Sequence, residues 1–234
     1  MRRLARVVTA ALLCAALEAH AQAGGEGEAN VMPCPGALAW NQAHPETSDA
    51  ALAQRDAART LTDPALRAEL DARFRRDQDA RIAWLRDLSD QRASKAVRMI
   101  DADDVQWLKA LVAEKGFPTA AQVGERGVRE AWLLAQHADK APAFQAALLP
   151  VLEQRHASGD LDGSDLARFT DRVLKAHGQP QRYGTQFTPR EWAGANFGLP
   201  DEASVRGIDA NRRALGIMPL ADYVCMMRWA RREH

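Results

Sequence analysis

One segment of the sequence, residues 128–138, restricts the fold more than any other because it is apolar around nearly its whole circumference. A helix turns by about 100° per residue, so one stripe of this segment would hold Val128, Ala131, Trp132, Ala135 and Ala138. Leu133 and Leu134 would lie on the other side. A helix that is apolar all round is normally buried among other elements. We therefore expect this segment to be the central helix of a helical fold.

The rest of the chain beyond residue 50 also favours helices, because β-branched residues and Tyr, which favour strands, are sparse there. Capping residues, Gly and Pro divide this region. The expected helices cover about 64–92, 103–114, Thr119 to Asp139, 142 onward with a kink at Pro150, Ser164 to Gly178, 202–215 and 220 onward. Short connections favour antiparallel neighbours. We predict a mainly α, compact single-domain bundle with an irregular loop or small hairpin near 182–199.

The first residues have the pattern of a secretory signal peptide. Arg2, Arg3 and Arg6 precede an apolar run over 7–17, which is too short to span a bilayer. A small-x-small pattern ending at Ala23 predicts cleavage there. We therefore divide the chain into a signal peptide (1–23), an irregular leader (24–48) and a helical domain (49–234), and we expect a periplasmic or secreted protein.

Two cysteines, Cys34 and Cys225, would remain after cleavage, because Cys14 lies in the signal peptide. An even pair in an oxidising compartment favours a disulfide. A disulfide also needs the two residues to lie close together in the fold. The sequence leaves that point open, so the pairing is one of two possibilities.

Asp77 and Arg81 are charged residues at positions where apolar ones are expected. They fall one turn apart inside the stripe that Leu66, Leu70 and Phe74 form on the first helix. Buried charges need partners and hydrogen bonds. One interpretation is an intrahelical ion pair on a shallow part of the face; the other is a polar pocket in the core.

His137 and Gln136 end the apolar segment, and we expect His137 to be buried and to need a partner. It is either a core histidine bonded to a carbonyl or carboxylate, or a general base or ligand-binding imidazole. His137 and Asp139 are two residues apart and face different directions on a helix. Asp139 is therefore better interpreted as a cap for the helix that Pro142 opens.

Other polar residues come from later in the chain. Arg212 lies within the apolar stripe of the sixth helix, so it needs an acidic partner or an anionic ligand, unless its stem reaches the solvent. Tyr183 and Gln186 belong to an irregular polar loop that suits a turn or the edge of a pocket. Asp171 and Arg172 point away from the stripe of the fifth helix, which favours a solvated face.

Several function classes lack support in the sequence. The 31 basic and 31 acidic residues balance without a Lys/Arg block, which argues against nucleic acid as a partner. No segment after the signal peptide is long and apolar enough to span a membrane. The chain has no G-x-S-x-G elbow, P-loop, dinucleotide fingerprint or zinc spacing. We therefore predict no cofactor and no metal.

Several short motifs follow one another in order along the chain. They are R-D-Q at 76–78, G-F-P at 116–118, AWLLAQHAD with F-Q at 144–145, D-R-V at 171–173, GQPQRYGTQ, Asp209, R-R at 212–213, L-G at 215–216 and P-L at 219–220. On these motifs, residues 64–224 resemble an uncharacterised bacterial family, a domain of unknown function. That family often has Trp where Phe117 stands, and the segment FTPREWAGANFG departs from its pattern. The resemblance implies a fold class but no reaction, substrate or catalytic residue.

Two hypotheses for function follow, and the sequence leaves open whether the protein is an enzyme. In the first, a pocket of Asp77, Arg81, His137 and Arg212, with Gln136, Tyr183 and Gln186, holds a small polar or anionic ligand, and His137 and Asp77 act as catalytic base and orienter or acid. In the second, the buried polar residues fix the packing of the helices. A non-enzymatic envelope protein would then bind a protein partner through loop 187–200, with Trp192 and Phe197 as contacts.

Overall fold

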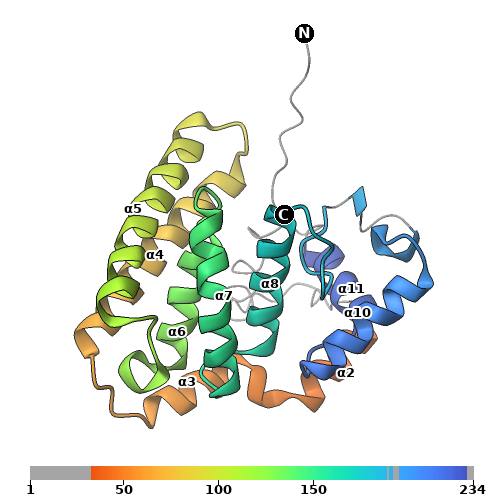
Figure 1. Cartoon of the computed structure of the whole chain (residues 1–234), viewed down its shortest axis with the longest axis horizontal. Coiled ribbons are helices and arrows are strands. Elements are labelled where there is room, and N and C mark those ends of the chain that lie inside the picture. The colour runs from red at the N-terminus through yellow and green to blue at the C-terminus, as the bar shows by residue number, and fades with distance from the viewer. Residues whose placement is uncertain (1–32, 189, 192–194, 231–234) are drawn as a thin grey trace, which may run out of the picture.

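The computed structural model describes residues 33–188, 190–191 and 195–230, and this part of the chain consists of helices and loops without a strand (Figure 1). The α-helices are α2 (Pro35–Ala43), α3 (Asp49–Ala57), α4 (Pro64–Arg86), α5 (Gln91–Lys115), α6 (Ala120–Gln136), α7 (Pro142–Ala157), α8 (Gly163–Ala176), α10 (Glu202–Ala214) and α11 (Leu220–Ala230), with 3₁₀ turns at Pro45–Thr47 and Ala195–Gly198. The predicted all-α fold is confirmed. The predicted signal peptide lies outside the described residues.

Helix α6 is the centre of the larger half of the molecule. It packs against α3, α4, α5 and α8, and Val128, Ala131 and Ala135 are fully buried. The predicted capping box is present, since the Thr119 side chain accepts from the Gln122 backbone N–H and the Gln122 side chain accepts from that of Thr119. The expectation of a central helix, drawn from residues 128–138, is therefore confirmed.

Helices α4 and α5 form an antiparallel pair beside α6 (Figure 1). We expected one helix over 64–92 and a shorter one from 103, but the chain turns at residues 87–90 and α5 is the longer helix. Asp90 causes this break, because its side chain accepts from two backbone N–H groups at the start of α5 and so favours a cap over helix continuation. Leu88, which continues the expected apolar stripe, is 52% exposed in the turn.

The segment before residue 58 is not the irregular leader that we expected for 24–48, since α2 forms within it. Pro35 at the first position and a backbone bond from His44 to Trp40 fit a short helix. Helix α3 then packs against α6. The Asp56 carboxylate accepts from the backbone N–H groups of Glu125 and Arg126, at 2.7 and 2.9 Å, where α6 bends.

A second, smaller core joins the two ends of the described chain. It contains Cys34, Ala37, Phe187, Ile208, Met218, Leu220, Tyr223, Val224 and Met227. Cys34 and Cys225 form a disulfide, with their Cα atoms 5.8 Å apart, that ties α2 to α11. This bond decides the question that the sequence left open. In Figure 1, α8 lies between the α4–α7 side and the α10–α11 side of the molecule.

Helix α8 begins two residues earlier than expected and buries both polar residues that we assigned to a solvated face. Its N-cap is Asp162, whose side chain accepts from the Ser164 backbone N–H, so Ser164 itself is not the cap. Asp171 is fully buried and Arg172 is 5% exposed. The solvated-face prediction was wrong because α8 is covered on both sides, by the larger core and by the loop at 181–187.

Candidate functional site

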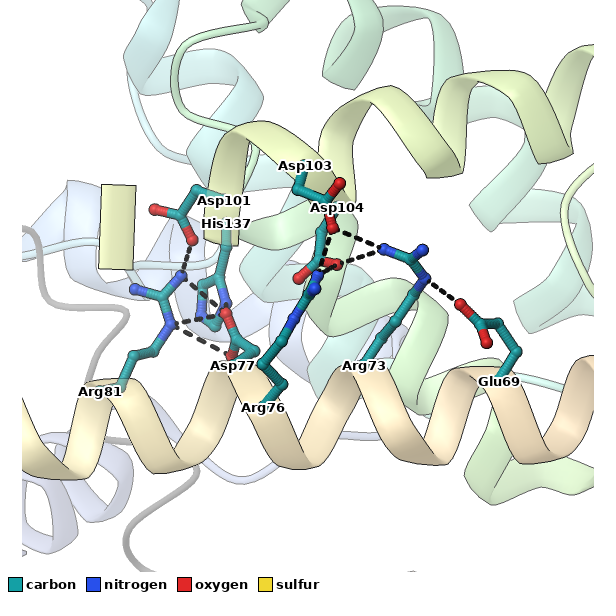
Figure 2. A network of polar contacts seen from close by, with 9 residues as sticks. All are labelled: Glu69, Arg73, Arg76, Asp77, Arg81, Asp101, Asp103, Asp104 and His137. Carbon is teal, nitrogen blue, oxygen red and sulfur yellow. Dashed lines mark hydrogen bonds and ion pairs between the residues drawn. The ribbon is translucent and has the colours of Figure 1, made fainter. Parts of the chain in front are cut away.

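Helices α4, α5 and α6 bring a cluster of titratable side chains together, which Figure 2 shows from close by. Asp77 and Arg81 project from consecutive turns of α4, Asp101 from α5, and His137 from the C-cap of α6. His137 ends its helix with αR backbone angles, and this places the imidazole against α4. The cluster therefore forms where the central helix ends between two neighbours.

The contacts within this cluster are short and buried. His137 Nδ1 lies 3.1 Å from Asp77 Oδ1, and Arg81 Nε lies 3.0 and 3.2 Å from the two oxygens of the same carboxylate. Arg81 Nη2 also pairs with Asp101. Asp77, Arg81 and His137 are at most 7% exposed, so the intrahelical ion pair and the buried histidine belong to one network.

Burial and neighbouring charges move the pKa values of these groups in different directions. Burial pushes the pKa of Asp77 up, but His137 and Arg81 together outweigh it and leave that pKa well below its usual range. Burial lowers the pKa of His137, and Asp77 only partly offsets this. The ring is therefore neutral at pH 7. Since Asp77 is ionised, Nδ1 donates to it and Nε2 is left as the basic nitrogen.

Asp101 is a member of the cluster that sequence reasoning missed. Burial raises its pKa to about 7, Arg81 opposes the rise, and the charges of Asp77 and Asp139 add to it. Its side chain is 25% exposed, so it is the part of the cluster that meets solvent. The sequence alone does not single it out, because its position opposite Arg81 follows from the packing of α4 against α5.

The oxygen and nitrogen atoms of Asp77, Asp101 and His137 lie within 4.8 Å of one another, a spacing that a metal ion can use. The Arg81 guanidinium contacts both carboxylates. The chain itself thus supplies the positive charge between them. The Arg81 guanidinium is therefore the cation that pairs with these carboxylates, and no metal-dependent step follows from the cluster.

Arg172 and Asp139 extend the cluster towards α8. Arg172 Nη1 pairs with Asp139, two residues after His137, and the Arg172 charge contributes to lowering the pKa of His137. The side-chain cap that we expected from Asp139 is absent, because the N-cap of α7 is Ala141 and its N–H groups receive no side-chain bond. Asp139 instead uses its carboxylate as the partner of a buried guanidinium.

Several polar atoms of α6 and α8 are buried without a hydrogen-bond partner in the described residues. They include Gln136 Oε1 and the Nε and Nη2 atoms of Arg172, as well as Trp132 Nε1. Buried polar groups normally have partners, so these atoms are exceptions that need an explanation. Gln136 was a predicted ligand-binding residue, whereas Arg172 was not.

Arg212, Tyr183 and Gln186 belong to a different region. Arg212 donates to the carbonyls of Met218 and Tyr183, at 2.5 and 2.7 Å, and lies over the Tyr223 ring. Gln186 donates to the Arg168 carbonyl. These residues hold the loop at 181–187 against α10 and α11. No hydrogen bond or ion pair within the described residues links them to His137.

Arg212 also lines a cleft of about 710 Å³ on this side of the molecule. Its walls come from α2, α3, α8 and α11, with Trp40, Arg55, Thr185 and Met226 among the lining residues. The Asp77–His137 cluster does not line this cleft. The residues predicted to form a single pocket therefore lie in two regions, the cluster around His137 and a separate cleft beside Arg212.

A second charged network lies beside the first, further along α4 and α5 (Figure 2). Arg73 Nη1 and Arg76 Nη2 both contact Asp103 and Asp104, at 2.5 to 3.1 Å. Arg73 also stacks over Trp107 at 4.4 Å. These contacts join α4 to α5.

The loop proposed for partner binding is only partly described, since Trp192 falls outside the described residues. Phe197 packs against the second core and lies 6.0 Å from the Arg228 guanidinium. Its side chain is half-buried, so this ring is part of the second core, and partner binding by the loop stays a prediction.

The family comparison covers most of the chain. The sequence model of DUF6624, described as a family of unknown function, matches residues 64–232. The chain belongs to this family. The resemblance expected over 64–224 is therefore confirmed, while α2 and α3 precede the matched region. Comparisons with curated proteins and with solved structures found no match. None of the described helices is long and apolar enough to cross a membrane.

Proposed function

We propose that this DUF6624 protein holds a small polar or anionic ligand beside His137, and that Nε2 of this residue acts as a general base. The observation that carries the proposal is the 3.1 Å contact between Nδ1 and Asp77. A carboxylate at Nδ1 fixes the tautomer and leaves Nε2 free to accept a proton. Within the part of the chain that the structure describes, the side-chain hydrogen bond of this ring is made by Nδ1.

The neighbouring residues take distinct roles in this proposal. Asp77 orients the ring and stabilises the imidazolium that forms after proton transfer. Arg81 keeps Asp77 ionised. Asp101 has a pKa of about 7, so part of the population carries a proton near neutral pH. General acid–base catalysis uses a carboxyl group with a raised pKa beside a neutral imidazole, and Asp101 would be the general acid.

Access to the cluster comes from the side of Asp101 and Asp139. Their side chains are 25% and 47% exposed, whereas Asp77 and His137 are buried. A ligand that displaces water there would meet the protonated carboxyl first and the imidazole below it. Two arginines, Arg81 and Arg172, supply positive charge to both sides of this path, which suits a ligand with negative or strongly polar groups.

The proposal is tested by ¹⁵N NMR of the histidine rings. At pH 7 we expect His137 to be neutral with its proton on Nδ1, and Asp77→Asn to change the tautomer ratio while the backbone spectrum keeps its dispersion. Acetate or inorganic phosphate should shift the Nε2 resonance. Asp79→Asn, an exposed aspartate on the same helix, is the matched control and should change nothing. A charged ring at pH 7, or a tautomer unaffected by Asp77→Asn, would contradict the proposal.

We also propose that the protein is exported and then cleaved after Ala23. The Cys34–Cys225 disulfide supports this, because stable disulfides form in oxidising compartments. Expression of the full chain followed by periplasmic extraction and intact-mass measurement should give a protein that starts at Gly24 and lacks free thiols. A full-length protein found only in the cytoplasm would contradict export.

A further inference from the structure

We propose that Arg172 is the anchor for a carboxylate of the ligand, which it binds side-on through Nε and Nη2. This inference rests on the proposed function, because it names the ligand class for the same site. It concerns a residue that the sequence pattern assigned to a solvated face. The chemical class is a small oxyanion, and a carboxylate is the form that fits best.

The first support is the hydrogen-bond state of the guanidinium. Arg172 is only 5% exposed, and of its nitrogen atoms Nη1 pairs with Asp139. Nε and Nη2 are buried and have no partner in the described residues. Leaving a buried donor unsatisfied costs on the order of 1–3 kcal/mol, and more for a charged group. A partner outside the protein chain would remove that cost.

The second support is the geometry of the two free donors. Nε and Nη2 belong to the same edge of the planar guanidinium, and their N–H bonds are roughly parallel. This edge matches the two oxygens of a carboxylate, giving a bidentate contact that neutral groups cannot reproduce. Asp139 uses the other end of the group. One guanidinium can therefore bind Asp139 and a ligand carboxylate together.

The third support is the position of Arg172 relative to the surface and to His137. Asp139, its partner, is 47% exposed, so the guanidinium lies one side chain below the surface. The Asp139 N–H donates to the His137 carbonyl at 2.9 Å, so Asp139, the partner of Arg172, lies on the same turn as His137. A carboxylate held by Arg172 would orient the rest of a small ligand towards the imidazole.

The main alternative is ordered water on the same edge. Water satisfies either donor singly, but it gives no preference for carboxylates and no dependence on the side-on edge. Replacing Arg172 by Lys keeps the charge and removes the paired donors. The comparison of Arg172→Lys with the wild type therefore separates a carboxylate site from a hydrated guanidinium.

The experiment measures binding of sodium acetate, sodium succinate and inorganic phosphate to the full mature protein, by NMR titration at constant ionic strength with chloride as reference. We expect the two carboxylates to bind the wild type and to shift the Arg172 Nε–H resonance. Arg172→Lys should weaken carboxylate binding by about tenfold or more, the loss of one bidentate charge-assisted contact. Arg206→Lys is the control, because Arg206 is 72% exposed, and it should bind as the wild type does.

His137→Gln separates the anchor from the base. If this variant still binds acetate while Arg172→Lys does not, the anchor stands whatever the role of the imidazole. If acetate shifts the His137 ring and Arg172→Lys binds it with unchanged affinity, the anchor is wrong and the proposed base survives. Binding of phosphate alone, or an Arg172 Nε–H resonance that no carboxylate moves, also overturns the inference. Urea unfolding of each variant confirms that it is folded.

Discussion

Asp171 and Arg172 are neighbours in the sequence and are both buried in α8, yet their hydrogen bonding is opposite. The Asp171 carboxylate accepts from the backbone N–H groups of Arg182, Tyr183 and Thr185, at 2.7 to 3.0 Å, and from the Thr185 hydroxyl at 2.9 Å. Within the described residues, Arg172 has one partner, and its other two buried nitrogen atoms have none. The hydrogen bonding of Asp171 is therefore satisfied by these residues, and that of Arg172 is not.

This difference distinguishes buried polar groups that stabilise the fold from buried polar groups that are available to a ligand. A buried group that the chain satisfies fully fixes the fold, as Asp171 fixes the loop at 181–187, and a ligand could only disturb it. A buried group that the chain leaves incomplete costs free energy unless something else binds it. The predictions below test this difference, from the largest expected effect to the smallest.

The disulfide should have the largest effect on stability, because it closes the second core to which the Asp171 loop belongs. Cys34 and Cys225 are separated by 191 positions, and the chain-entropy model gives about 5 kcal/mol for so long a loop. We expect the double variant Cys34→Ser/Cys225→Ser to lose stability on that order in urea unfolding. Reductant should destabilise the wild type and leave the double variant unchanged; equal stability of the two proteins would contradict this.

Asp101 should give the cluster around His137 a pH-dependent contribution to stability. Its folded pKa is about 7, against 3.8 for an unperturbed group, so between pH 4 and 7 the folded state binds more protons than the unfolded state. The contribution of Asp101 therefore lowers stability as pH rises through this window and levels off above pH 7. Each pKa unit is about 1.4 kcal/mol, so the change is up to about 4 kcal/mol.

Asp101→Asn removes this contribution. We expect its stability relative to the wild type to increase from pH 4 to pH 8, as measured by urea unfolding at each pH. Asp79→Asn, on the exposed face of α4, is the control and should follow the wild-type curve. Parallel curves for Asp101→Asn and the wild type would show that the carboxyl titrates normally.

Asp171→Ala should destabilise the protein by about 3 kcal/mol, since four donors of the loop would lose a buried acceptor. Amide hydrogen exchange should show the loss first at 182–185, because those N–H groups are directly released. Asp79→Ala, at an exposed position without such partners, should stay within about 0.5 kcal/mol of the wild type. An equally small loss of stability for Asp171→Ala would contradict the structural role proposed for this carboxylate.

The sequence allowed the helices and the central position of α6 to be predicted, because apolar periodicity and capping residues are local signals. His137, Asp77 and Arg81 were also found locally, as polar residues on apolar faces. Asp101 and Arg172 were missed, since their importance depends on which helices pack together and not on their own stripes. Arg212 was grouped with His137 because a buried arginine looks the same in sequence whether carbonyls or ligands bind it.

Arg172→Met should have the smallest effect on stability, within about 1 kcal/mol of the wild type. The change removes a pair with Asp139, which is half-exposed and can be hydrated, and it also removes two buried donors that have no partner in the described residues. Replacing an incompletely satisfied buried charge by an apolar side chain of similar length is often neutral or stabilising. Urea unfolding of Arg172→Met beside Asp171→Ala compares adjacent positions of one helix directly. A loss for Arg172→Met as large as that for Asp171→Ala would mean that the guanidinium holds the fold together, and the distinction between complete and incomplete polar groups would then fail at the residue on which it depends most.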